Sequence, residues 1–242
     1  MIRYAITISY DGGGFCGWQH QANCDSVQDA VEKAIFLLSG ERVKVVGSGR
    51  TDAGVHALGQ VASFSLEKDL AENVIVGGLN AHLPKSIRIL SAKKTEESFD
   101  ARKSAKKKTY MYLMYRGNAL PVLYNRALCV GDVNVEAMRA AAKDIVGTHD
   151  FSTFKAAGSG AKTSVRTVYD VRIDDDGKFI KLFITANGFL YNMVRIIAAQ
   201  LVKIGSGAKV DIKELIEKRD RTAAKETAPA FALYLYSVEY ND

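Results

Sequence analysis

The sequence predicts an α+β fold with two similar halves, each running strand, helix, strand, helix, strand. Residues 2–10 alternate apolar and polar side chains, which is the period of a strand buried on one face. Residues 26–40 carry apolar side chains at helical spacing between a serine and a glycine. Similar patterns recur later in the chain, so we divide it near residue 103 into halves 1–102 and 103–242. Two such halves suggest a pseudo-twofold arrangement with a cleft where they meet.

Local signals define the elements of the first half. Ser26 is a typical helix N-cap and Gly40 a typical C-cap, so a helix is predicted between them. A second helix is predicted just before Pro84, because proline is common shortly after helix ends. Besides the strand at 2–10, the predicted elements of this half are the helix at 27–39, a strand at 60–65, a helix at about 70–82 and a strand at 86–92.

The second half is bounded in the same way. Asn134 is the predicted N-cap of a helix that ends before Gly147. A turn sequence at 175–177 separates two β-rich runs, which predicts a hairpin. Small residues at 156–160 predict a mobile loop. The other predicted elements are an aromatic strand at 109–115, hairpin strands at 164–174 and 178–185, an apolar helix at 189–204, a short helix at 211–219 and a closing strand at 233–240.

Composition indicates a soluble globular protein, with 48% hydrophobic and 25% charged residues in 242. The formal net charge of +6 fits a polyanionic partner. The sequence shows neither a signal-peptide pattern nor an apolar run of about 18 residues that would span a bilayer. We therefore expect a cytoplasmic protein without a membrane partner.

The cysteines and histidines favour neither a metal site nor a disulfide framework. Cys16, Cys24 and Cys129 form no CxxC pair and leave one over, which indicates a reducing cytoplasm and no structural zinc. The four histidines form no HxH or HxxxH pair. The glycine runs at 12–14 and 47–49 lack the Lys and Ser/Thr of a P-loop. No metal, cofactor or bound nucleotide is expected.

Residues 47–56 are the stretch around which the chain is organised. Asp52 lies two residues after Arg50, with glycines on both sides. On an extended segment, residues two apart point the same way, so this acid and this cation can face one cleft. The alternative is a surface loop with an ordinary Arg–Asp pair. The strand predicted at 60–65 places Asp52 at the edge of an element, where scaffolds commonly present catalytic groups.

A basic run precedes the aromatic strand at 109–115. Its five cations are Arg102, Lys103, Lys106, Lys107 and Lys108. Tyr110 and Tyr112 share one strand face and could stack on a base while the lysines contact phosphates. The alternative is that the lysines form a solvated face and the tyrosines belong to the core or edge of a sheet.

The apolar run 189–204 is interrupted by Arg195, and the next cation, Lys203, lies at the end of the run. A buried guanidinium needs a partner. Asp52 is an attractive partner, because a nearby cation keeps a carboxylate ionised inside a closed site. The alternative is an arginine whose head group reaches the surface while its stem stays buried.

Two segments carry a resemblance to a known family. Residues 49–64, GRTDAGVHALGQVASF, closely resemble the active-site motif of the TruA family of tRNA pseudouridine synthases. Residues 188–195 match the family's GFLxxMVR segment. The resemblance covers nearly the entire chain, with further matches at 10–12, 17–19, 26–28, 79–80, 83–84, 99–102 and 147–154.

The resemblance implies a fold, an activity and roles for particular residues. The fold would be the pseudouridine synthase fold, with two ferredoxin-like halves forming a continuous mixed, largely antiparallel sheet around a central basic cleft. The protein would be an isomerase that converts uridine to pseudouridine at positions 38–40 of the tRNA anticodon stem-loop, as a homodimer and without a cofactor. Asp52 would be the catalytic carboxylate, Arg195 its partner, and Tyr110 the residue against the target uracil. Substrate contacts are also expected from Arg50, Leu233, Lys106, Lys107 and Lys108.

The sequence departs from the family pattern at several positions, among them Asp100, Lys103 and Ala232, where a histidine, an aromatic residue and a glycine are common. These departures concern the fit of the RNA rather than the reaction. A second hypothesis is a non-catalytic RNA-binding protein with ferredoxin-like halves. It explains the basic run and the tyrosines but gives no reason for an Asp–Arg pair.

Overall fold

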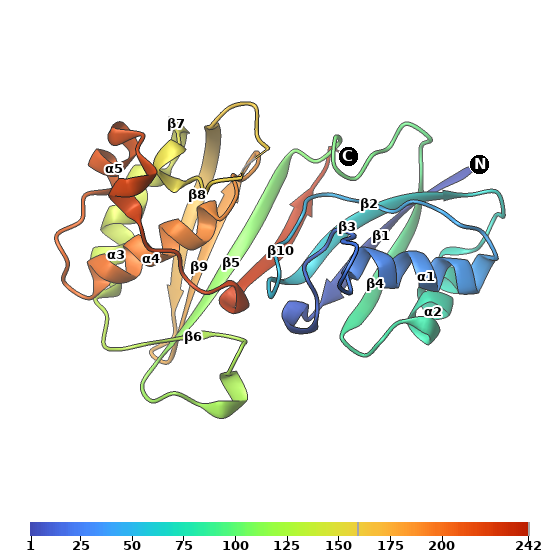
Figure 1. The fold of residues 1–242 in the computed structure, drawn as a ribbon, viewed down its shortest axis with the longest axis horizontal. Helices are drawn as coiled ribbons and strands as arrows, with labels where there is room; N and C mark the ends of the chain where they lie inside the picture. Colours follow the sequence, from blue (N-terminus) through green and yellow to red (C-terminus); the bar gives the residue numbers. More distant parts are fainter. Residues whose placement is uncertain (159, 242) are drawn as a thin grey trace. The chain divides into compact units, whose positions relative to one another are not determined.

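The computed structural model describes residues 1–158 and 160–241, which form two compact units (Figure 1). Unit 1 consists of Met1–Lys106 with Tyr234–Asp242, and unit 2 of Lys107–Leu233. Each unit combines helices with a β-sheet, which confirms the α+β class. Across the described residues, no helix combines the length and apolar character needed to cross a membrane. The division into halves 1–102 and 103–242, and the cleft where they meet, stay predictions.

Unit 1 contains a ferredoxin-like βαββαβ arrangement. The strand order is β4-β1-β3, with both β2 and β10 pairing with β3. Pairing is antiparallel except for β10, which runs parallel to β3. The elements are β1 (Ile2–Tyr10), α1 (Val27–Ser39), β2 (Val46–Gly47), β3 (His56–Leu66), α2 (Glu72–His82), β4 (Ile87–Thr95) and β10 (Leu233–Glu239).

Local sequence explains how unit 1 forms its elements and its core. The alternation in β1 buries Tyr4, Ile6 and Ile8 completely or nearly so. For an aliphatic side chain, such burial stabilises the fold by about 1.5–3 kcal/mol. The predicted caps of α1 are confirmed: Ser26 Oγ accepts the backbone N–H of Asp29 at 3.1 Å, and Gly40 is left-handed.

Unit 2 repeats the order strand, helix, strand, strand, helix in β5, α3, β8, β9 and α4. Its strands are ordered β5-β9-β8-β7 with antiparallel pairing, and β6 runs parallel to β5. The predicted hairpin is confirmed as β8 and β9. The elements are β5 (Lys107–Arg116), β6 (Leu128–Val130), α3 (Val135–Ala142), β7 (Gly147–Asp150), β8 (Val165–Asp175), β9 (Phe179–Ala186), α4 (Met193–Gly205) and α5 (Ile212–Lys218).

The start of α4 differs from the prediction. We expected a helix from residue 189, but α4 begins at Met193. Asn192 has a φ of 61°, in the left-handed region, and so cannot continue a right-handed helix. The backbone N–H of Met193 donates to Leu190 O at 3.1 Å, which closes a turn before the helix. The apolar pattern at 189–192 therefore belongs to a turn.

Other boundaries shift by smaller amounts. The helix α3 ends at Ala142 and continues as a short 3₁₀ turn, Lys143–Ile145, before Gly147. The short strands β2, β6 and β7 were not predicted. The predicted mobile loop at 156–160 includes residue 159, which lies outside the described residues.

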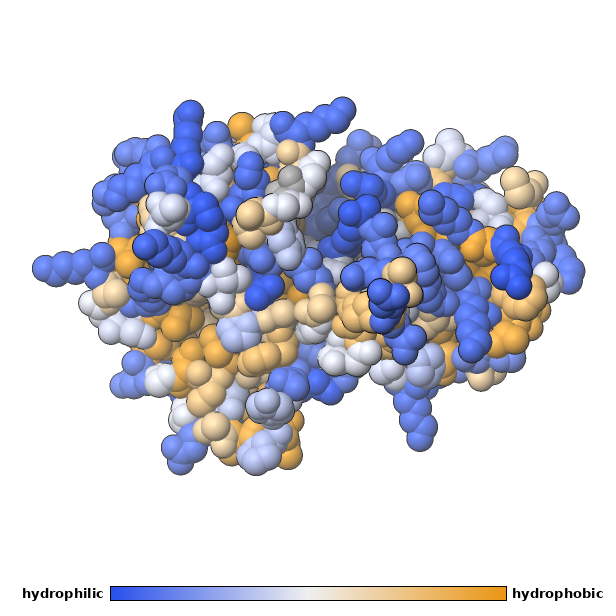
Figure 2. All heavy atoms as spheres, in the orientation of Figure 1, coloured by the Kyte–Doolittle hydropathy of each residue, from blue (hydrophilic) through white to orange (hydrophobic). Residues whose placement is uncertain are grey.

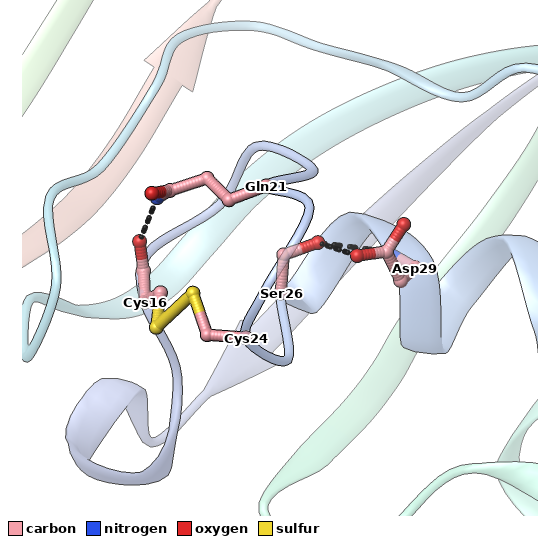
Figure 3. Close-up of a disulfide and its surroundings, with 5 residues drawn as sticks. All are labelled: Cys16, Gln21, Cys24, Ser26 and Asp29. Atoms are coloured by element: carbon pink, nitrogen blue, oxygen red, sulfur yellow. Dashed lines mark hydrogen bonds between the residues drawn. A yellow bond between two sulfur atoms is a disulfide. The ribbon is translucent and has the colours of Figure 1, made fainter.

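A disulfide joins Cys16 and Cys24, which lie between β1 and α1 (Figure 3). The sequence analysis did not predict this bond. The two cysteines are eight positions apart in the sequence, and no pairing rule links that spacing to a bond. Cys129 is free.

Candidate active site

The loop between β2 and β3 carries Asp52 and Arg50. The side chain of Asp52 is half-buried, and that of Arg50 is exposed. A turn follows directly: the backbone N–H of Val55 donates to Asp52 O at 3.1 Å, and Gly54 has a φ of 76°. Glycine adopts this conformation without the steric cost that other residues meet. The turn fixes the chain on the C-terminal side of Asp52.

A fully buried amide, Gln60, fixes the N-terminal side of the same loop. Ser48 Oγ donates to Gln60 Oε1 at 2.6 Å, and Gln60 Nε2 donates to Gly49 O at 2.9 Å. The backbone N–H of Ser48 also donates to Val61 O at 2.7 Å. A buried polar group left without a partner costs about 1–3 kcal/mol, so these bonds strongly favour one loop conformation.

Thr51, next to Asp52, is held by residues from the start of the chain. The backbone N–H of Trp18 donates to Thr51 O at 3.0 Å, and Tyr10 Oη lies 2.8 Å from Thr51 Oγ1. Burial raises the pKa of Tyr10 far above its ordinary value, so this bond joins two neutral hydroxyls. Gly17 has a φ of 99°, and a Cβ placed on it would lie 2.4 Å from Thr51 O. Only glycine permits this approach.

The first residues of β3 complete the support of the loop. The backbone N–H of Gly12 donates to Nδ1 of the buried His56 at 3.1 Å, and the imidazole stacks on Tyr234 at 4.7 Å. The same Nδ1 lies 3.1 Å from Oδ1 of Asp11, so the ring is held from the residues that follow β1 as well as by Tyr234. Asp52 thus lies in a loop that is held at several points by hydrogen bonds on both sides of it.

In unit 2, Arg195 lies on the first turn of α4 and is half-buried. Its Nε donates to Ala228 O at 2.7 Å, and one terminal nitrogen donates to Asn192 Oδ1 at 2.7 Å. The left-handed turn that the sequence analysis missed therefore supplies a side-chain oxygen that orients this guanidinium. Its positive charge also acts on Tyr112, where it partly offsets the rise in pKa that burial causes.

Tyr110 and Tyr112, both on β5, have different neighbours. Tyr110 is 8% exposed, and its ring packs edge-on against Phe189 at 4.9 Å. Tyr112 is fully buried, and its hydroxyl donates to Pro229 O at 3.0 Å. The expectation that Tyr112 could stack on a base is therefore wrong, because the core covers its ring. Tyr110 is nearly buried as well, but it lies closer to the surface than Tyr112. Leu233, the first residue of β10, is buried at 6% exposure.

The basic run is held through its backbone and through Lys107, whose ammonium lies 5.4 Å from the centre of the Tyr169 ring. Asp100 Oδ1 accepts the backbone N–H groups of Arg102 and Lys103 at 2.9 and 2.8 Å, which caps a turn. Asp100, one of the departures from the family pattern, therefore has a local structural role. The side chains of Lys106 and Lys107 are exposed and that of Lys108 is half-buried.

The predicted site residues fall into two groups, one in each unit. Arg50 and Asp52 share one loop in unit 1. Lys106, the third predicted residue of this unit, lies outside that loop. Unit 2 contains Tyr110 and Arg195, with Lys107, Lys108 and Leu233. The pairing of Arg195 with Asp52 stays a prediction. Sequence reasoning missed Gln60, Tyr10 and Trp18, because their contacts with the loop depend on how distant segments fold together.

Unit 2 also contains an apolar pocket of about 500 Å³, and Figure 2 shows apolar side chains gathered around the segment that precedes β6. Its lining includes Tyr115, Leu120, Tyr124, Leu128 and Phe231. None of the predicted site residues lines it.

Comparison with known proteins points to one family. The family described as "tRNA pseudouridine synthase" matches residues 6–102 and 141–241. The tRNA pseudouridine synthase A of Thermoanaerobacter sp. (strain X514) is 43% identical over 244 residues, covering 99% of this chain and 100% of the relative. That of Acetivibrio thermocellus is 44% identical over 245 residues, with the same coverage.

Among solved structures, the chain is similar to one of an H/ACA ribonucleoprotein bound to a substrate RNA containing 2′-deoxyuridine. The TM-score is 0.38 and the identity 14%, covering 83% of this chain and 44% of the other. The family assignment therefore rests on the sequence matches.

Proposed function

Because the chain belongs to the tRNA pseudouridine synthase family, we propose that it isomerises uridines 38–40 of the tRNA anticodon stem-loop, with Asp52 as the catalytic carboxylate. One observation carries the assignment of Asp52. The acid lies in the segment that resembles the family's active-site motif, on a loop fixed by Gln60, Trp18 and Tyr10, with its carboxylate half-buried.

The reaction rearranges bonds within a single nucleotide. The bond between N1 of uracil and C1′ of ribose breaks, the uracil turns, and its C5 bonds to C1′. The hydrogen on C5 is lost as a proton, and N1 ends with a proton. There is no net oxidation, and no second substrate is consumed, so the chemistry requires acid–base or nucleophilic help and accurate positioning.

An ionised carboxylate suits each role open to Asp52. It could attack C1′, attack C6 of uracil, or remove a proton from the ribose, and all three use the carboxylate form. In each case the carboxylate must lie at a defined distance from the ribose or the uracil. The hydrogen bonds around residues 48–56 supply that positioning before the substrate binds.

The other site residues act on the RNA around this carboxylate. The target uridine must leave its stack, as for other enzymes that act on a base. We assign Tyr110 and Leu233 to contact with the flipped uracil, and exposed Arg50 to the vacated space or a phosphate. Arg195 keeps Asp52 ionised in this proposal. Lys106, Lys107 and Lys108 contact the phosphate backbone.

The main experiment measures tritium release from tRNA labelled at C5 of uracil, since forming the new carbon–carbon bond must displace that hydrogen. Replacing uridines 38, 39 and 40 by cytidine, one at a time and then together, locates the target. We expect release from unmodified tRNA and none from the triple replacement. Binding of tRNA without release would favour the RNA-binding hypothesis, and release from the triple replacement would disprove the assignment to positions 38–40.

We also propose, from the family resemblance alone, that the protein acts as a homodimer in the cytoplasm. Light scattering on the purified protein, across a range of concentrations, tests the oligomeric state. A monomer mass at concentrations that support full activity would contradict the proposed homodimer.

A further inference from the structure

We propose that Cys16 and Cys24 form a reversible thiol–disulfide site that sets the rate of isomerisation by changing how firmly the Asp52 loop is held. This inference rests on the proposed role of Asp52. It adds a site of covalent modification, and the chemical class of its reactant is a small dithiol or disulfide.

Cys16 and Cys24 are partly accessible, and they are close enough to interconvert between the dithiol and the disulfide. The two Cα atoms lie 6.2 Å apart, within the range that a disulfide spans without backbone movement. Both cysteines are half-buried, and residues 19–23 between them are exposed. Gln21 Nε2 donates to Cys16 O at 2.7 Å, and Gln21 forms an isolated β-bridge with Cys24 (Figure 3). A small thiol can therefore reach a bond at the surface.

Reduction would leave most of the local fold in place. The backbone N–H of Cys16 donates to Asp25 O at 3.0 Å, that of Val27 to Gly17 O at 3.2 Å, and that of Gln28 to Trp18 O at 2.9 Å. These bonds tie the segment after β1 to the start of α1 without help from sulfur. Without the disulfide, these hydrogen bonds alone hold residues 16–18, so the segment moves more widely although the helix stays on the sheet.

The segment that gains freedom touches the backbone of the candidate catalytic loop. Gly17 follows Cys16 and lies so close to Thr51 O that a Cβ on it would be 2.4 Å away. Trp18, buried against Gly47, donates to the same oxygen at 3.0 Å. Thr51 precedes Asp52, so motion of residues 16–18 passes directly to the carboxylate. The disulfide form is the more firmly held state and hence the faster one.

The exchange step balances as a two-electron reaction. A thiolate of the reductant attacks one sulfur of the Cys16–Cys24 bond and forms a mixed disulfide, releasing the other sulfur as a thiolate. The second thiol of the reductant then displaces the protein sulfur. The protein gains two electrons and two protons, and the dithiol becomes a cyclic disulfide. Oxidation by a small disulfide, such as oxidised glutathione, is the reverse exchange.

The experiment uses the full-length protein in buffers that range from oxidised glutathione to reduced dithiothreitol. At each composition, free thiols are counted by alkylation and mass spectrometry, and the single-turnover rate of tritium release is measured. We expect two thiols to appear together and the rate to fall by about threefold to tenfold with the same midpoint. A rate that stays constant while the pair titrates would overturn the proposal, and so would three free thiols in every buffer.

Serine variants provide the matched controls. The double variant Cys16→Ser/Cys24→Ser should show the rate of the reduced protein in every buffer, with a circular dichroism spectrum like that of the wild type. Cys129→Ser, which removes the free cysteine, should respond as the wild type does. A redox response that persists in the double variant would disprove the site. Absence of tritium release in every buffer would instead disprove the proposed function, and this inference with it.

Discussion

The Asp52 loop and the basic run at 102–108 are both prominent in the sequence, and the structure holds them in different ways. The loop is anchored by buried side chains, among them Thr51, His56 and Gln60. In the run, Asp100 caps the backbone, whereas the side chains of Lys106 and Lys107 are exposed.

This difference follows from what each region is proposed to do. Bond rearrangement at one carbon requires interatomic distances that are correct to within a few tenths of an ångström. The carboxylate of Asp52 must therefore be fixed before the substrate arrives. Attraction to phosphates acts through counterion release and tolerates mobile side chains. Variants in the loop should therefore alter the rate of chemistry, and variants in the run should alter binding.

The largest effect is expected from Asp52→Asn. Removing the carboxylate should lower kcat by about 10³-fold or more, while the tRNA dissociation constant changes less than about threefold. Single-turnover tritium release and filter binding measure the two quantities. Asp25→Asn, at an exposed acid before α1, is the matched control and should behave as the wild type. Activity of Asp52→Asn within tenfold of wild type would remove Asp52 from its role.

Arg195→Met tests whether the two units share a charge pair. Removing one partner of a buried ion pair costs about 3–5 kcal/mol, because the other charge is left uncompensated, and we expect a smaller cost here because Asp52 and Arg195 are both half-buried. Arg195→Met also removes the hydrogen bonds to Ala228 O and Asn192 Oδ1, whether residue 52 is Asp or Asn. Only the difference between the stability losses in these two proteins measures the interaction of Arg195 with Asp52.

Urea unfolding of the wild type, both single variants and the double variant with Asp52→Asn gives that difference. We expect Arg195→Met to destabilise the Asp52→Asn protein much less than the wild type. The single variant should also raise the pKa of Asp52 and so lose most activity at low pH, regaining part of it as the pH rises. Additive losses of stability would show that Arg195 does not face Asp52.

Gln60→Leu should weaken the loop without touching the carboxylate. The variant removes the hydrogen bonds that Gln60 makes with the Ser48 hydroxyl and with Gly49 O, at a cost of about 1–3 kcal/mol. We expect kcat to fall by about tenfold and KM to stay nearly constant, because the lost interaction positions the catalytic group. Steady-state kinetics and thermal unfolding provide both numbers.

Asn80→Leu is the control for this prediction. Asn80 is another side-chain amide of unit 1, on α2. Its Oδ1 accepts the backbone N–H of Ile89 on β4 at 2.8 Å, and its Nδ2 donates to Ile89 O at 2.9 Å. Its loss should reduce stability by a similar amount and leave kcat unchanged at temperatures where the variant is folded. Equal effects of both variants on kcat would mean that Gln60 acts only through global stability.

The smallest effect is expected from neutralising Lys106, Lys107 and Lys108 together. Each lost phosphate contact reduces the salt dependence of binding by about 0.7–0.9 in log–log slope, so the triple alanine variant should lose roughly two. Rates at saturating tRNA should change little. A control variant that neutralises three exposed lysines elsewhere in unit 2 has the same net charge: Lys209, Lys213 and Lys225. If both variants showed the same salt dependence of tRNA binding, the effect would come from net charge alone and not from these three lysines.

The sequence predicted what depends on neighbours in the chain. Ser26 and Gly40 bound α1 through bonds to residues at most four positions away, so their roles could be predicted from the sequence. The family motif likewise placed Asp52 in a loop before a strand, as the structure shows.

Contacts between distant segments could not be predicted in the same way. Tyr10 meets Thr51 across 41 positions, and the pairing of Tyr10 with Ala57 at the start of β3 helps to bring them together. The cysteines at 16 and 24 pair because the segment between them folds back, which no spacing rule encodes. The left-handed Asn192 was hidden by the apolar residues on both sides, which continue the helical period through the turn.

The pairing of β10 with β3 has a consequence for the order of events during synthesis. The ladder joins Tyr234 to His56 and Leu235 to Ala57, beside the residue proposed for catalysis. All of Lys107–Leu233 must be translated between these partners, which takes on the order of ten seconds at about 5–20 residues per second. During that interval the first residues of β3 lack this neighbour, and His56 lacks the tyrosine ring on which it stacks. A nascent chain would therefore keep the Asp52 loop without part of its support until the final strand leaves the ribosome.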